Sequence, residues 1–218
     1  MSLGSFHQRV IKMASWHEDK LWADAYLPII QKTVKSIAGK IITIEEASPD
    51  EDIKFATDYR LVSVDGGSIG CRIRNGSKFF IQYHDLTIRS SRLSGVLTEL
   101  DKIRSGFPKW YFYGWADGST MPYWIFIDMD KFRSPSVIDN PRSSNVPNWD
   151  GSSTFNGYDV FDLFLNKCII GMSKEVKFFL KDRRQMRITG QIYRGVSRMN
   201  PPWKSGRVAD RAGRLEIT

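Results

Sequence analysis

"DYRLVSVDGGSIGCRIRNG", residues 58–76, is the stretch that decides the fold. Polar and apolar residues alternate on both sides of Gly66-Gly67, and a glycine pair between two such runs is typical of a tight hairpin. A second turn signal, Asn75-Gly76, ends the return strand. We therefore expect an antiparallel meander of three strands, at residues 58–65, 68–75 and 78–90.

A helix is expected on each side of this meander. Residues 20–38 carry apolar residues at helical spacing, and Pro28 is expected to kink this helix or to begin its second half. Residues 94–106 run from Ser94, a good N-cap, to Gly106, a good terminator. The helix-strand-helix order predicts an α+β domain.

The rest of the chain is expected to complete one domain over residues 1–172. Two strands rich in aromatic residues, 109–116 and 121–132, are joined by a turn at Asp117-Gly118. Residues 134–157 are crowded with Ser, Asn, Pro and Gly and are expected to form a loop. The mixed segment that follows, up to residue 172, is expected to pack on the main sheet.

The net charge of +8 resides at the end of the chain. From residue 173 onward, twelve Lys and Arg stand against four acids, whereas the first 172 residues carry twenty of each. This excess favours a basic C-terminal arm, residues 173–218, that faces a polyanion. A solvated, partly disordered tail is the alternative.

Residues 83–92, "YHDLTIRSSR", place three polar side chains on alternate positions. In a strand, Asp85, Thr87 and Arg89 would share one face, while Leu86 and Ile88 would point the other way into a core. A carboxylate, a hydroxyl and a guanidinium side by side suit a site for a metal ion and a phosphate group.

The order α-β-β-β-α-β, with Asp58 in "ATDYR" and Asp85 in "DLTIR", resembles the core of the PD-(D/E)XK restriction-endonuclease-like superfamily over residues 20–130. The resemblance implies a largely antiparallel mixed sheet flanked by helices. It also implies a nucleic-acid-processing protein, a metal-dependent phosphodiesterase (nuclease). In that enzyme Asp58 and Asp85 would bind Mg²⁺ or Mn²⁺, and Thr87 and Glu99 would assist.

Two features depart from the superfamily pattern. Thr87 stands where the family usually has Lys, and the strand after Asp58, "CRIR", carries no acid. An arginine could replace the charge of that Lys, but it stays protonated and is a poor general base. A non-catalytic nucleic-acid-binding module, a nuclease fold without its activity, is therefore the alternative function.

A third hypothesis is a phage structural or host-interaction protein. The segments "ATD", "TIRS" and "WYFYG" resemble those of uncharacterised phage and prophage proteins. This second resemblance implies a viral or prophage setting and no particular chemistry.

Arginines are the expected contacts to a nucleic-acid backbone. Arg72 and Arg74 share one strand face, which Arg89 would join across the sheet. If that face is open, they form a phosphate-binding row; if it is closed, they pair with Asp58, Asp65 and Asp85. The candidate nucleic-acid-binding residues are Arg72, Arg74, Arg89, Arg92, Arg183, Arg184 and Arg187.

Other candidate residues also have a structural interpretation. Asp58 and Asp85 are either metal ligands or strand-end residues paired by turns or arginines, and Glu99 either faces the site or lies exposed on its helix. The aromatic run at residues 110–115, "WYFYGW", either stacks on unpaired bases or fills a core on both sides of a strand.

Several classes of protein have no motif in this chain. The histidines lack zinc spacing, and there is no phosphate loop, dinucleotide fingerprint or serine-hydrolase elbow. Cys71 and Cys168 are expected to be reduced, and no apolar run reaches the roughly 18 residues of a membrane span. We expect a cytoplasmic protein (host-cell cytoplasm if phage-encoded) with no membrane partner. DNA is favoured over RNA as its partner, and a homodimer is compatible with the sequence.

Overall fold

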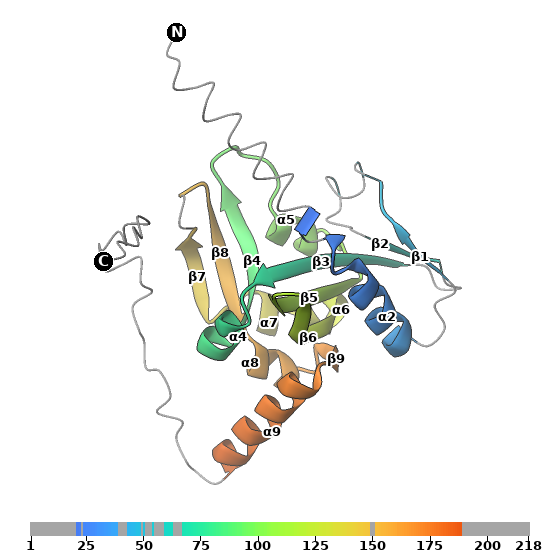
Figure 1. Cartoon of the computed structure of the whole chain (residues 1–218). Helices are drawn as coiled ribbons and strands as arrows, with labels where there is room; N and C mark the ends of the chain where they lie inside the picture. Colours follow the sequence, from blue (N-terminus) through green and yellow to red (C-terminus); the bar gives the residue numbers. More distant parts are fainter. Residues whose placement is uncertain are drawn as a thin grey trace, which may run out of the picture.

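The computed structural model describes residues 21–22, 24–38, 43–48, 50, 54, 59–62, 67–148 and 151–188 (Figure 1). This part of the chain is α+β, with a mixed six-stranded sheet, an antiparallel three-stranded sheet and flanking helices. The strands are β1 Thr43–Glu46, β2 Tyr59–Val62, β3 Gly67–Asn75, β4 Asp85–Arg92, β5 Trp110–Asp117, β6 Thr120–Asp128, β7 Ser143–Pro147, β8 Ser153–Asp159 and β9 Ile169–Met172. The helices are α2 Leu27–Ala38, α4 Lys78–Tyr83, α5 Glu99–Arg104, α6 Met129–Phe132, α7 Pro135–Ile138, α8 Val160–Leu165 and α9 Lys174–Ile188.

The six-stranded sheet has the order β1-β2-β3-β5-β6-β9. All of its neighbours are antiparallel except β3 and β5, which run parallel. The three-stranded sheet has the order β4-β8-β7 and is antiparallel throughout. These findings confirm the mixed sheet flanked by helices.

The expected meander is only partly present. The antiparallel pairing of β2 with β3 agrees with the hairpin prediction; residues 63–66, the predicted turn, lie outside the described residues. The third strand is present over residues 85–90 but wrong in its start and its partner, because β4 begins at Asp85 and pairs with β8 in the second sheet. Parallel strands need a long crossover, and α4, β4 and α5 together provide it between β3 and β5.

Residues 78–83 form the helix α4 rather than a strand. Gly76 has φ 105°, a conformation that glycine adopts without strain, and it turns the chain out of β3. One turn later Phe80 is buried, with its ring against the rings of Trp115 and Tyr123. The helix ends at His84, whose φ of 51° is left-handed, and β4 starts at the next residue.

The second predicted helix is present but shorter than expected. It begins after Thr98 rather than Ser94, because the Thr98 side chain accepts a bond from the Asp101 amide while the Asp101 carboxylate accepts one from Thr98 N. This reciprocal capping box fixes the start of α5. Leu100 and Ile103 are buried below it.

The aromatic run of β5 is core on both sides. Tyr111, Tyr113 and Trp115 point into the main core, which lies between the two sheets and the helices α4 to α9. Phe112 and Ala116 point to the opposite face of the sheet, which α2 covers. The core interpretation of "WYFYGW" is therefore confirmed. Strand β5 also pairs antiparallel with β6, the next strand along the chain.

The predicted loop at residues 134–157 is wrong in large part. It contains α7, β7 and the beginning of β8, which together complete the second sheet. The next segment packs on the main sheet as expected, since β9 pairs with β6.

Pro28 is the second residue of α2, which confirms that it lies in a first helical turn.

The basic segment begins with a packed helix. Val176 and Leu180 of α9 belong to the main core, and α9 lies below the two sheets in Figure 1. Residues 189–218 lie outside the described residues. Within the described ranges, no helix is long and apolar enough to cross a membrane.

Candidate functional site

Strand β4 brings its predicted polar residues to one face, but that face is covered. Leu86 and Ile88 are fully buried in the main core, as expected. Thr87 is only 4% exposed, and its hydroxyl lies 2.8 Å from the Tyr113 hydroxyl. A buried hydroxyl pair of this kind satisfies both groups, so Thr87 serves as a link between the two sheets.

Glu99 is the centre of a polar cluster between the sheets. Its Oε2 accepts bonds from Arg72 Nη1 at 2.8 Å and from the Arg89 amide at 3.0 Å. Its Oε1 accepts a bond from the Tyr111 hydroxyl. Glu99 is 16% exposed, so the exposed interpretation is wrong. One carboxylate therefore connects α5 with strands β3, β4 and β5.

Arg72 is held in the same cluster. Its Nη1 also donates to the Thr87 carbonyl at 3.2 Å. Burial alone would lower the pKa of Arg72, but the Glu99 carboxylate and the Tyr113 and Tyr111 side chains raise it above its ordinary value. The Arg72 guanidinium is thus permanently charged and occupied by Glu99.

Asp85 at the start of β4 faces Arg74 of β3. Asp85 Oδ1 and Arg74 Nη1 lie 3.6 Å apart as an ion pair, which confirms the salt-bridge interpretation for these two residues. Neither of these two buried atoms has a hydrogen-bond partner among the described residues. Burial raises the pKa of Asp85, and the positive charges of Arg74 and Arg142 oppose that rise.

Asp159 carries a second cluster, which sequence reasoning missed. Its carboxylate is 3% exposed and accepts two bonds from Arg183 Nη1, at 2.9 and 3.0 Å, and one from Arg142 Nη1, at 3.1 Å. It also caps α8 by accepting from the Phe161 amide. Arg183, a candidate nucleic-acid contact, thereby anchors α9 to the second sheet.

Two further arginines of the β3–β4 region, Arg89 and Arg92, differ in burial. Arg89 is half-buried, and burial together with the charges of Arg72 and Arg92 lowers its pKa. Arg92 is exposed at the end of β4. Of the predicted row of Arg72, Arg74 and Arg89, the first two are paired with acids. Arg89, together with Arg92 outside that row, remains as a smaller positive area.

The predicted metal pair is Asp58 and Asp85, of which only Asp85 belongs to the described residues. Asp58 lies outside the described residues. Over the ranges that the structure describes, no three His, Cys, Asp or Glu side chains form a group that could hold a metal ion. Both Glu99 oxygens and the Thr87 hydroxyl are already hydrogen-bonded.

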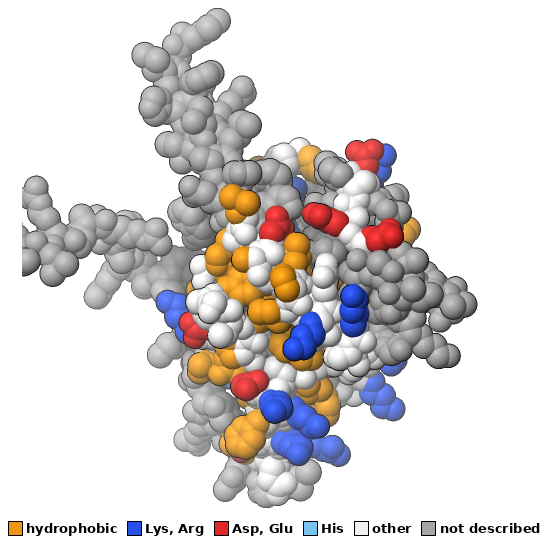
Figure 2. Space-filling model, turned by 45° about the vertical axis from the view of Figure 1, so that its right-hand side comes forward, with side chains coloured by type: hydrophobic (Ala, Val, Ile, Leu, Met, Phe, Trp, Pro, Cys, Tyr) orange, Lys and Arg blue, Asp and Glu red, His pale blue; other side chains and the backbone are white. Residues whose placement is uncertain are grey.

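Helix α9 presents a basic surface outside these clusters. Over its length six cations stand against two acids, Glu175 and Asp182. Figure 2 shows Lys and Arg side chains gathered at the foot of the molecule, at the level of α9, beside an exposed hydrophobic side chain. We call the exposed cations of this helix the α9 surface; they are Lys174, Lys177, Lys181, Arg184 and Arg187.

Sequence reasoning found two of these five residues, Arg184 and Arg187. The signal for the others is the segment "KEVKFFLKDRR", residues 174–184, where an aromatic pair stands among cations. Interleaved aromatic and basic residues are typical of nucleic-acid-binding segments. Comparisons with protein-family models, with curated proteins and with solved structures found no match to this chain.

Proposed function

We propose that this chain binds nucleic acid through the α9 surface, and that its buried carboxylates hold the two sheets and α9 together. The observation that carries the proposal is the division of α9 into two sides. Val176 and Leu180 fix one side in the core, and Arg183 on that side is bonded to Asp159. Lys174, Lys177, Lys181 and Arg184 are exposed on the other side, and Arg187 is exposed near the end of the helix. A rigid row of cations suits the phosphate backbone, whose contacts supply sequence-independent affinity.

Removing two of these charges tests the proposal. Lys177→Gln/Lys181→Gln is expected to weaken binding to a labelled DNA oligonucleotide at low salt. For two lost phosphate contacts, the slope of log affinity against log salt should become less negative by about 2 units. The measurement is fluorescence anisotropy over a salt series, with an RNA oligonucleotide of the same sequence in parallel.

The matched control is Lys32→Gln/Lys35→Gln on α2, which removes the same charge from another exposed helix surface. It should leave the salt slope unchanged. An equal loss in both double variants would mean that net charge alone drives binding, and the α9 surface would then have no special role.

The second candidate function is a metal-dependent phosphodiesterase, with Asp58 and Asp85 as ligands of Mg²⁺ or Mn²⁺. One observation favours it: Asp85 Oδ1 is a buried carboxylate oxygen without a hydrogen-bond partner in the described part of the chain. Mg²⁺ prefers such oxygens. The described residues supply one oxygen rather than a ligand set, so no catalytic step is derived through the metal.

Plasmid nicking tests this second function. If it holds, supercoiled plasmid with Mn²⁺ should be nicked by the wild type, and both Asp58→Asn and Asp85→Asn should abolish the activity. Removing a metal ligand typically costs several orders of magnitude, whereas Asp139→Asn, a change in an exposed ion pair, should have no effect. Equal nicking by all variants would rule out these two ligands.

A further inference from the structure

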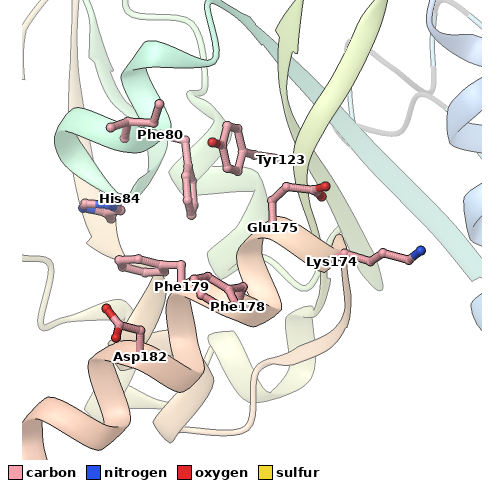
Figure 3. Close-up of a pocket in the computed structure, with 9 residues that line it drawn as sticks. Phe80, His84, Tyr123, Lys174, Glu175, Phe178, Phe179 and Asp182 are labelled. Carbon is pink, nitrogen blue, oxygen red and sulfur yellow. The ribbon is translucent and has the colours of Figure 1, made fainter.

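An open groove lies between α4 and α9. It has a volume of about 600 Å³, within the range of small-molecule sites. Its walls are mainly aromatic and apolar, and Figure 3 shows the rings of Phe80, Tyr123 and Phe179 facing the same space. The apolar and aromatic lining residues are Phe80, Ile81, His84, Tyr123, Phe178 and Phe179.

The groove is built from stacked rings. His84 and Phe179 lie parallel, with ring centroids 4.2 Å apart and planes 3° apart. Phe80 and Tyr123 are also stacked, at 4.5 Å. Burial lowers the pKa of His84 to about 4, and the nearby Arg183 charge contributes, so its ring is neutral at physiological pH. The rings of the lining are therefore uncharged, and their stacking on one another makes this wall firm.

Phe178 stands at the edge of the groove with 75% of its surface exposed. Lys174 and Lys181 flank it at four residues before and three after, so both lie on the same side of the helix as Phe178. The two lysines are separated by about 10 Å along the helix axis. An exposed ring between two cations is the arrangement that single-strand binders use for a base and its phosphates.

The acidic side chains of the groove favour a base over a phosphate as the group that enters it. Glu175, Asp182 and Lys174 also line it, and Figure 3 shows the Lys174 amino group directed away from the rings. A phosphate inside the groove would therefore meet two carboxylates. The amino groups of unpaired bases, by contrast, can donate to a carboxylate. This distribution of charge places phosphates outside, along the lysines, and a base inside.

We propose that the groove between α4 and α9 receives an unpaired base of single-stranded nucleic acid. The base stacks on the exposed ring of Phe178, and Lys174 and Lys181 hold the adjoining phosphates. This inference rests on the proposed function, since it names the form of nucleic acid that the α9 surface binds. In a duplex the base faces are already stacked and cannot enter the groove.

The test compares a labelled single strand with its duplex in fluorescence anisotropy at low salt. Phe178→Ala is expected to weaken single-strand binding roughly 5- to 150-fold, the usual cost of one lost stacking contact, and duplex binding less than about twofold. Phe178→Trp should retain the single-strand affinity. A strand of abasic sites, which keeps its phosphates, should bind weakly and should not respond to Phe178→Ala.

The control is Leu93→Ala, since Leu93 is a hydrophobic residue outside the groove and is 86% exposed. It should leave both affinities unchanged. Thermal unfolding of Phe178→Ala should match the wild type, because the side chain is largely exposed. Single-strand binding that is indifferent to Phe178→Ala overturns the base site, but leaves the α9 surface standing. Absence of binding to both forms overturns the site and the proposed function together.

Discussion

Asp159→Ala is expected to destabilise the protein by about 3–5 kcal/mol, the cost of breaking a buried ion pair by removing one partner. The carboxylate is almost completely buried and serves both Arg183 and Arg142. Its loss removes the acid partner of both guanidinium groups, of which Arg142 keeps its bond to the Tyr83 carbonyl, and it removes the side-chain cap of α8 at the same time. Urea unfolding followed by circular dichroism measures the loss.

Two further variants separate the causes. Asp159→Asn can still accept the bond from the Phe161 amide but no longer neutralises the arginines. It should therefore lower the free energy of unfolding by less than Asp159→Ala does. Asp139→Ala breaks the ion pair with Arg104, whose two side chains are exposed, and should cost at most about 1 kcal/mol. If Asp159→Ala destabilised the protein no more than Asp139→Ala, the stabilising role of the Asp159 ion pairs would be contradicted.

Glu99→Ala is expected to have the second largest effect, a loss of about 3 kcal/mol. The substitution leaves the Arg72 guanidinium, the Arg89 amide and the Tyr111 hydroxyl without their common acceptor. In a protein of this size the melting temperature should fall by about 6–12 °C. Differential scanning calorimetry provides the measurement.

Glu99→Gln keeps the shape of the side chain, and its amide oxygen can still accept a hydrogen bond. It should therefore lower the free energy of unfolding by about half as much as Glu99→Ala. Glu175→Ala on the exposed part of α9 is the matched control and should stay within about 0.5 kcal/mol of the wild type. If Glu99→Ala were as stable as the control, Glu99 would not join the sheets.

The sequence predicted those elements whose pattern is local. The alternation of polar and apolar residues along positions 85–89 correctly predicted the two faces of β4. In contrast, the short run at residues 78–83 suits a strand and a helix equally well, and periodicity cannot separate them. Its helix depends on the burial of Phe80 against Trp115 and Tyr123, residues far along the chain.

The partners of the candidate site residues were harder to predict for the same reason. Arg74 opposite Asp85 was foreseen as one of two alternatives, because both lie on adjoining predicted strands. The bond from Arg72 to Glu99 spans 27 residues, and that from Arg183 to Asp159 spans 24. Such pairs follow from the arrangement of the two sheets, which no local pattern in the chain specifies.

The interleaving of the two sheets along the chain limits how the protein can be divided. Strand β4 of the second sheet comes between β3 and β5 of the first, and β7 and β8 come between β6 and β9. No single cut in the backbone therefore separates one sheet from the other, and neither can be expressed as a continuous fragment. The antiparallel pairs β2–β3, β5–β6 and β7–β8 join strands that are adjacent in sequence and can close locally, whereas β3–β5, β4–β8 and β6–β9 bring distant segments together. We therefore expect the two sheets to unfold together in a single transition.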